Sequence, residues 1–167
     1  MLNMSDYNER NRIGKRAESI FSVLISKYIP NKNCHLLNPE FLGDKYPSVD
    51  FIVELAKCDK TKAFFFASVR STREGYTVRD NNLLVKYRKD DLDELKKIPV
   101  PTYLIGIDEK DENGFIISAQ DTNSDNISSF PTLYPINEQN IEILWEEVKK
   151  YWDNSVELTK LSSTFKI

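Results

Sequence analysis

The sequence predicts a single α/β domain, spanning residues 1–167, in which a mixed central sheet is flanked by helices. Three observations support this class: an N-terminal segment with helical apolar spacing, two apolar segments joined by a short polar turn, and a later succession of helix, paired strands and helix. A chain of 167 residues can build one hydrophobic core but not two comfortable ones. We therefore expect one domain.

The first element is a predicted helix over residues 6–28, with Asp6 and Glu9 as a capping pair and Pro30 just beyond its end. Apolar residues recur at helical spacing along it: Ile13, Ala17, Ile20, Phe21, Leu24 and Tyr28. Glu18 lies at the margin of this apolar stripe. It can either reach toward whatever the stripe packs on or remain solvated and pair with Lys15.

Three strands are predicted next. Residues 34–42 indicate a short strand interrupted by Pro39. Residues 49–56 (VDFIVELA) alternate between apolar and polar, which is typical of a strand with one buried face. Residues 63–69 (AFFFASV) are continuously apolar and predict a strand buried on both faces. The polar segment CDKTK between the last two is a suitable hairpin connection.

The second half of the chain predicts a loop over 71–82, with a short strand at 76–78, and then a helix over 90–98 with its acids first and its lysines last. A hairpin follows, with strands at 102–108 and 114–119 and a turn containing Asn113-Gly114. The final predicted element is a helix over about 137–153, whose apolar face includes Leu144 and Val148.

Composition excludes several classes of function. The net charge of −3 means that any nucleic-acid site must be a local patch. Cys34, Cys58 and the single histidine, His35, are too few for a disulfide scaffold or a Cys/His zinc site. No apolar run reaches the roughly 18–20 residues of a membrane span, and the N-terminus lacks the apolar block of a signal peptide. We therefore expect a cytoplasmic protein without a membrane partner.

The predicted hairpin carries the candidate chemistry. Asp50 near the start of one strand and Arg70 at the end of the next fall at the same end of an antiparallel pair. Carboxylates that converge on a strand end can hold Mg²⁺ or Mn²⁺, and Glu18 of the first helix is a second candidate ligand. A neighbouring cation can stabilise charge that develops on a phosphate.

Four segments, in order, resemble the PD-(D/E)XK nuclease superfamily, and in particular an uncharacterised bacterial domain group within it. They are RIGKRAE (12–18), SVDFIVEL (48–55), FFFASVRST (64–72) and PVPTYLIGID (99–108). The resemblance covers about residues 10–118 and implies a restriction-endonuclease-like αβββαβ core. It also implies metal-dependent hydrolysis of phosphodiesters, often in DNA and often in restriction, repair or defence against foreign DNA.

Matched position by position, the resemblance implies that Asp50 is the metal-binding aspartate and Glu18 the helix glutamate. The Val69 carbonyl is a further candidate ligand of Mg²⁺ or Mn²⁺ beside these two carboxylates. Ser68 stands where the family has Glu or Gln, and Arg70 stands where it has Lys. Serine is a weak ligand for Mg²⁺, and arginine keeps its proton and cannot act as a base.

These departures leave three interpretations open. The domain is a divergent nuclease acting on nucleic acid, with DNA as the first candidate, or it is an inactive nuclease-fold module that binds nucleic acid or a protein partner. In the third interpretation, the resemblance is mistaken and the chain is an unrelated α/β interaction domain. For Asp50 itself, the alternative to metal binding is an architectural salt bridge with Arg70.

A basic segment follows the candidate site. Between residues 68 and 89, six basic residues oppose two acidic ones, and Tyr76 and Tyr87 are interleaved with them. This composition favours contact with a nucleic-acid backbone, whereas the alternative is an ordinary solvated loop. The residues predicted to contact nucleic acid are Arg73, Arg79, Lys86 and Arg88.

Overall fold

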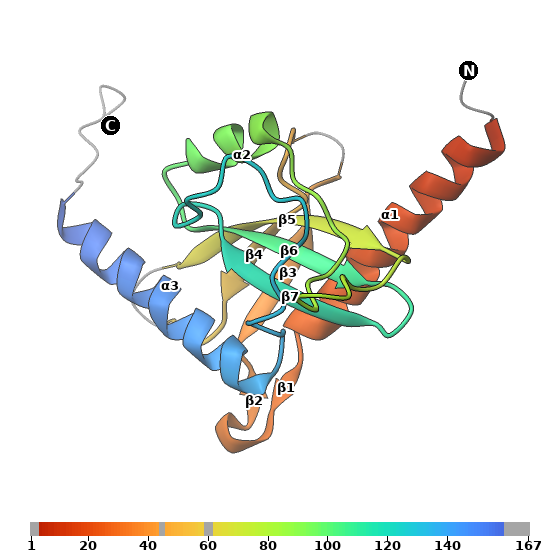
Figure 1. Cartoon of the computed structure of the whole chain (residues 1–167). Coiled ribbons are helices and arrows are strands. Elements are labelled where there is room, and N and C mark those ends of the chain that lie inside the picture. The colour runs from red at the N-terminus through yellow and green to blue at the C-terminus, as the bar shows by residue number, and fades with distance from the viewer. Residues whose placement is uncertain (1–3, 44–45, 59–61, 159–167) are drawn as a thin grey trace.

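The computed structural model describes residues 4–43, 46–58 and 62–158. Its centre is a five-stranded mixed sheet with the spatial order β3-β4-β5-β6-β7 (Figure 1). The strands are β3 (Leu37–Phe41), β4 (Phe51–Leu55), β5 (Phe64–Thr72), β6 (Thr102–Asp108) and β7 (Asn113–Ser118). Neighbouring strands are antiparallel except β5 and β6, which are parallel. The predicted α/β class with a mixed sheet is confirmed.

Helices cover both faces of this sheet. Helix α1 (Met4–Ile25) and helix α3 (Glu138–Leu158) contribute to one hydrophobic core, together with β5 side chains such as Phe65 and Ala67. Helix α2 (Lys89–Lys96) and the segments around Leu83 and Phe130 contribute to a second core on the opposite face. No helix in the described part of the chain is long and apolar enough to cross a membrane.

Helix α1 is confirmed, but both of its predicted ends are wrong. It already includes Met4, so Asp6 lies inside the helix rather than at its cap, and it ends at Ile25 rather than at residue 28. Tyr28 instead begins a two-stranded ribbon of β1 (Tyr28–Ile29) and β2 (Cys34–His35), joined by a 3₁₀ turn over Pro30–Lys32. The His35 ring lies 2.6 Å from the Ser26 carbonyl, so the ribbon helps to terminate the helix.

Strand β3 continues through Pro39 instead of being interrupted there. Pro39 is paired with Val53 of β4, and β3 forms an edge of the sheet. The flanking hydrogen bonds, from Leu42 to the Asp50 carbonyl and from Ala56 to the Leu36 carbonyl, place the Pro39 nitrogen on the outer side. A proline is tolerated in this position because the ladder needs no hydrogen bond from it.

Strands β4 and β5 confirm the predicted hairpin partners, and β5 extends three residues further, to Thr72. β5 is the central strand, which explains its continuous apolar sequence. The connection between β4 and β5 lies partly outside the described residues. Helix α2, predicted over 90–98, carries the chain from β5 to β6 as a crossover between parallel strands.

Two details of the second half are wrong. The expected strand at 76–78 is only a single bridge between Tyr76 and Leu83. Asn113 and Gly114 lie in β7 rather than in the turn, where Glu112 adopts the positive φ of 55°. A Cβ at Gly114 would come within 2.9 Å of Leu24 in α1, so this glycine allows close packing rather than a turn.

Candidate functional site

Asp50 directly precedes β4 and extends its pairing with β5. Its backbone N–H donates to the Ala67 carbonyl at 2.9 Å, and its carboxylate accepts the Val69 N–H at 2.6 Å. The side chain thus satisfies a β5 amide just beyond the end of the β4 ladder. This bond gives Asp50 a structural role whether or not its carboxylate also binds a ligand.

Ser68 and Val69 lie within the buried part of β5. Ser68 is almost fully buried, and its backbone carbonyl accepts a hydrogen bond from the Tyr87 hydroxyl at 2.7 Å. The Val69 side chain belongs to the core under α1 and α3. The side chains of both residues are therefore surrounded by protein.

Arg70 lies near the same end of the β4–β5 pair as Asp50, as predicted. It forms an ion pair with a residue of α2. Its guanidinium nitrogen lies 3.8 Å from a carboxylate oxygen of Asp91. Its charged group also lies 5.8 Å from the centre of the Tyr87 ring, within the range of a cation–π interaction. Arg70 therefore links the end of β5 to the helix that follows it.

Tyr87 is the residue at this site that sequence reasoning misjudged. It is 1% exposed, so it cannot contact a nucleic-acid backbone as the interleaved pattern implied. Its hydroxyl lies 3.0 Å from the Ile105 carbonyl and accepts the Ile105 N–H at 3.3 Å, in addition to its bond with Ser68. Burial raises the Tyr87 pKa, and the nearby Arg70 charge opposes the shift. The apolar alternation of Leu83, Val85 and Tyr87 was the available signal.

Glu18 is half-buried on α1, one helical turn before Phe21. The Phe21 ring packs edge-on against Phe51, with ring centroids 5.0 Å apart, and Phe51 directly follows Asp50. This contact brings the same stretch of α1 toward the start of β4.

The donor set for a divalent metal here is small. In the described part of the chain, no group of three or more His, Cys, Asp and Glu side chains is placed to hold a metal ion. A metal bound by Asp50 and Glu18 would therefore depend on the Val69 carbonyl and on water for the rest of its shell, which Mg²⁺ accepts more readily than other ions. The residues present therefore fit a Mg²⁺ ion that keeps several of its waters.

The basic residues after β5 have different surroundings. Arg73 donates through Nε to Glu109 at 3.0 Å, and the Glu109 side chain is only 1% exposed. Arg79 is 94% exposed and 3.9 Å from Asp80. Lys86 and Arg88 are exposed and form no ion pair within the described residues. Arg73 therefore compensates a buried carboxylate, whereas the other three predicted contacts face solvent.

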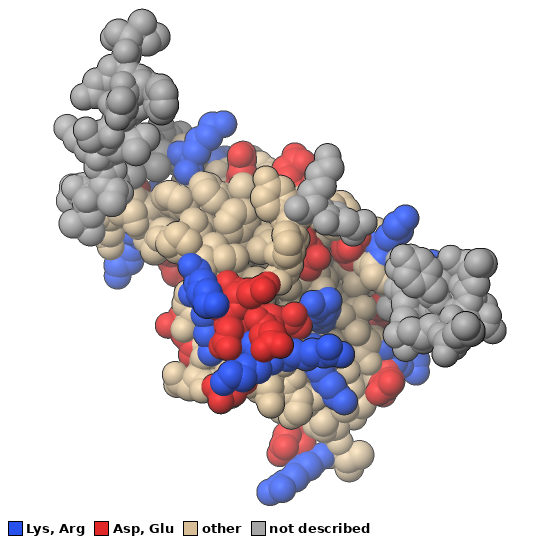
Figure 2. Space-filling view, turned by 90° about the horizontal axis from the view of Figure 1, so that it is seen from above, with Lys and Arg blue, Asp and Glu red and all other residues tan. Residues whose placement is uncertain are grey.

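Acidic side chains interrupt this basic surface. Lys89 pairs with Asp125 at 3.2 Å, and the first turn of α2 contains Asp90 and Asp91. Figure 2 shows acidic side chains gathered in the middle of the upper face with basic side chains around them. The excess of positive charge along the segment is thus not a continuous basic patch in space.

Glu109 and Ser71 form a polar cluster that the sequence analysis missed. Ser71 donates to Glu109 at 2.8 Å, and Glu109 also bonds to Arg73. The two interacting segments are brought together because β5 and β6 are parallel and end at the same edge, with Thr72 paired to Asp108. The acidic run IDE at the end of an apolar segment was the signal, but its partners depend on the parallel pairing.

Comparison of the chain with family models, curated proteins and solved structures gives no match.

Proposed function

We propose that this chain is a divergent PD-(D/E)XK-type nuclease-fold domain that binds nucleic acid or a protein partner without cleaving phosphodiesters. The observation that carries the proposal is the order of α1, the antiparallel strands β3, β4 and β5, the crossover α2, and the parallel strand β6. This order agrees with the αβββαβ core that the resemblance implies, with the β1–β2 ribbon inserted between α1 and β3. Under this proposal, Asp50, which directly precedes β4, takes the family's metal-binding position.

The residues around Asp50 favour binding over cleavage. Ser68 replaces a charged or amide ligand and is enclosed by protein. Arg70 replaces a lysine, keeps its proton at working pH and is engaged with Asp91 and Tyr87. One Asp50 oxygen accepts a backbone amide. Each of these groups contributes to the stability of the fold without requiring a metal.

A second candidate is a metal-dependent nuclease that uses Asp50 and Glu18 as its carboxylates, with Arg70 positioned to stabilise a phosphate. The contact between Phe21 and Phe51 favours it, because it directs the Glu18 turn of α1 toward the Asp50 end of β4. Mg²⁺ or Mn²⁺ bound there would supply Lewis-acid stabilisation of the phosphate.

The two candidates are separated by Asp50→Asn. The amide oxygen can still accept the Val69 N–H, so this variant removes the charge without removing the structural hydrogen bond. We expect the wild-type protein to show no cleavage of single- or double-stranded DNA or RNA with Mg²⁺ or Mn²⁺, and no metal-dependent rise in Tm. Cleavage that is abolished in Asp50→Asn, while Tm is retained, would instead establish the nuclease.

Nucleic-acid binding is tested on the two exposed basic residues before α2. We expect Lys86→Gln combined with Arg88→Gln to weaken binding to a DNA duplex. The slope of the logarithm of the binding constant against the logarithm of the salt concentration should become less steep by about 0.9 for each phosphate that the protein no longer neutralises. The matched control is Lys27→Gln combined with Lys32→Gln, which removes the same charge near α3. Equal affinity and equal salt slopes for both double variants would contradict a nucleic-acid contact at Lys86 and Arg88.

A further inference from the structure

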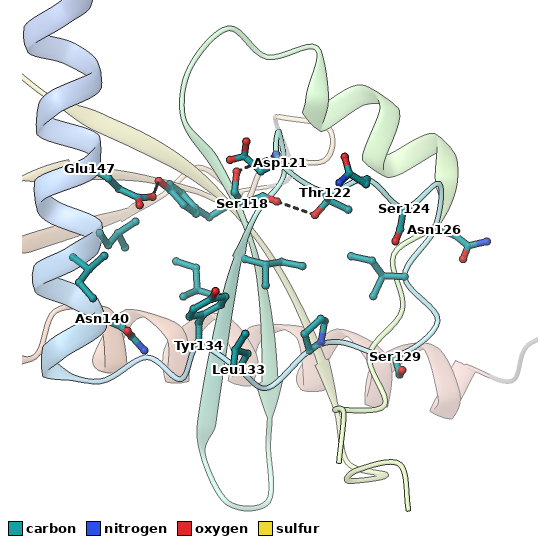
Figure 3. A pocket seen from close by; sticks show the side chains of 18 of the residues that line it. Ser118, Asp121, Thr122, Ser124, Asn126, Ser129, Leu133, Tyr134, Asn140 and Glu147 are labelled. Carbon is teal, nitrogen blue, oxygen red and sulfur yellow. Dashed lines mark hydrogen bonds between the residues drawn. The ribbon is translucent and has the colours of Figure 1, made fainter. Parts of the chain in front are cut away.

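A groove lies beside the outer edge of β7, on a different part of the molecule from Asp50. It has a volume of about 850 Å³ and is bounded by β7, the segment 121–134 and α3 (Figure 3). β7 is the last strand of the sheet, so one of its edges faces this groove. The groove therefore combines an open sheet edge with two walls from other elements.

The segment that leads into α3 covers the first half of the β7 edge. Ile136 donates to the Gly114 carbonyl at 2.7 Å, and Ile116 donates to the Tyr134 carbonyl at 3.0 Å. Preceding Tyr134, the covering segment separates from β7 and forms the far wall of the groove, which includes Leu133. The second half of β7 thus lies along the groove.

The register of the sheet shows which backbone groups face the groove. In an antiparallel ladder, hydrogen-bonded and non-hydrogen-bonded residue pairs alternate. Ala119 donates to the Thr102 carbonyl at 2.9 Å, so the next pair, Tyr103 and Ser118, is a non-hydrogen-bonded pair. Ser118 and, two residues earlier, Ile116 therefore direct their N–H and C=O groups away from β6.

The four outward groups of Ile116 and Ser118 differ in their hydrogen bonds. The Ser118 carbonyl accepts the Thr122 hydroxyl at 2.9 Å, and the Ile116 N–H is bonded to Tyr134. The Ile116 carbonyl and the Ser118 N–H take part in no backbone hydrogen bond outside the sheet ladder in the described part of the chain. In a parallel ladder, one residue of an added strand would donate its N–H to the Ile116 carbonyl and accept the Ser118 N–H with its own carbonyl.

Charge and exposed apolar surface define the rest of the occupant. Asp121 and Glu147 are the charged residues of the lining, which includes no lysine or arginine among the described residues. Leu133, Tyr134 and Ile143 are large apolar residues of the lining that remain exposed. Figure 3 shows Ser118 beside Asp121, with Glu147 on α3 and with Leu133 and Tyr134 lower in the view. A phosphate backbone would be repelled here, whereas a segment with alternating basic and apolar side chains is complementary.

We propose that this groove binds an extended, basic segment of a protein partner, which adds to β7 as a parallel strand opposite Ile117. Backbone hydrogen bonds to Ile116 and Ser118 hold the segment, and its basic side chains lie beside Asp121 and Glu147. An antiparallel segment is disfavoured because it would need the Ser118 carbonyl, which Thr122 already occupies.

The test uses the full chain and a labelled, end-capped hexapeptide of alternating lysine and valine. We expect the peptide to bind by fluorescence anisotropy and to slow hydrogen exchange of the Ser118 amide at least tenfold. The same peptide with every backbone nitrogen methylated keeps its charge but has no N–H left to donate to the Ile116 carbonyl, so it should not bind. A peptide of alternating glutamate and valine should also fail to bind.

The protein-side control uses neighbouring acids on α3. Glu147→Gln should weaken binding about three- to fivefold, which is the effect of one partly exposed charge pair. Glu146→Gln removes the same charge outside this groove and should leave the affinity unchanged. The proposal is overturned if the lysine–valine peptide does not bind, if N-methylation has no effect, or if Ser118 exchange is unaltered. Equal binding of the glutamate peptide would overturn the assignment of a basic partner.

Discussion

Replacing Tyr87 with phenylalanine tests whether the hydroxyl of this residue holds the candidate site together. The change keeps the buried ring but removes a group that bonds to the Ser68 carbonyl at 2.7 Å and to Ile105 at 3.0 and 3.3 Å. Buried backbone groups that are left without a partner cost about 1–3 kcal/mol each, and partial re-pairing between β5 and β6 reduces the total. We expect Tyr87→Phe to lower the free energy of unfolding by about 2–3 kcal/mol.

The effect is measured by urea and thermal unfolding followed by circular dichroism. For a domain of this size, each kcal/mol corresponds to a Tm change of about 2–4 °C, so we expect a decrease of about 4–12 °C with an unchanged urea m-value. Tyr151→Phe is the matched control, because its hydroxyl bonds to the Pro99 carbonyl at 2.7 Å at an exposed position. If Tyr87→Phe is no more destabilising than Tyr151→Phe, the role assigned to the buried hydroxyl is wrong.

Three further predictions follow from burial and packing. The folded-state pKa of Tyr87 lies above the ordinary value near 10, so its contribution to the free energy of unfolding is complete below pH 10. Above pH 10 this contribution falls by up to about 1.4 kcal/mol per pH unit. In urea titrations between pH 9 and 11, the free energy of unfolding of Tyr87→Phe should therefore fall less steeply with pH than that of the wild type. Arg73→Gln should cost about 1.5–3 kcal/mol because it leaves the buried Glu109 carboxylate without its cation, and an unchanged urea midpoint would contradict this. Gly106→Ala places a Cβ 2.8 Å from the buried Phe130 ring and should lower Tm through a loss of about 1–3 kcal/mol, whereas Gly14→Ala on α1 meets no atom within 4 Å and should not destabilise.

The sequence predicted the local structure of the central strands well because burial on two faces leaves a clear composition. Residues 63–69 show this directly: the run is apolar because α1 and α3 cover one face of β5 and the second core covers the other. The position of Asp50 beside the end of β5 was also predictable, since a hairpin fixes which residues are opposite each other.

The partners of the site residues were much less predictable. Arg70 pairs with Asp91 because α2 crosses over the end of β5, and Arg73 pairs with Glu109 because β5 and β6 are parallel. Neither ion pair has a signature in local spacing. The burial of Tyr87 was also not predictable from its residue type, because a tyrosine ring and hydroxyl suit a binding surface and a buried position equally well.

Pro39 has a consequence for how the molecule meets copies of itself. Its nitrogen faces outward at the middle of β3, so an additional strand approaching that edge would find backbone donors only at Leu37 and Phe41, about 13 Å apart. Such an interrupted row of donors cannot template a continuous cross-β stack. Folded copies are thereby hindered from pairing edge to edge through β3, and replacing Pro39 with threonine would restore the missing donor.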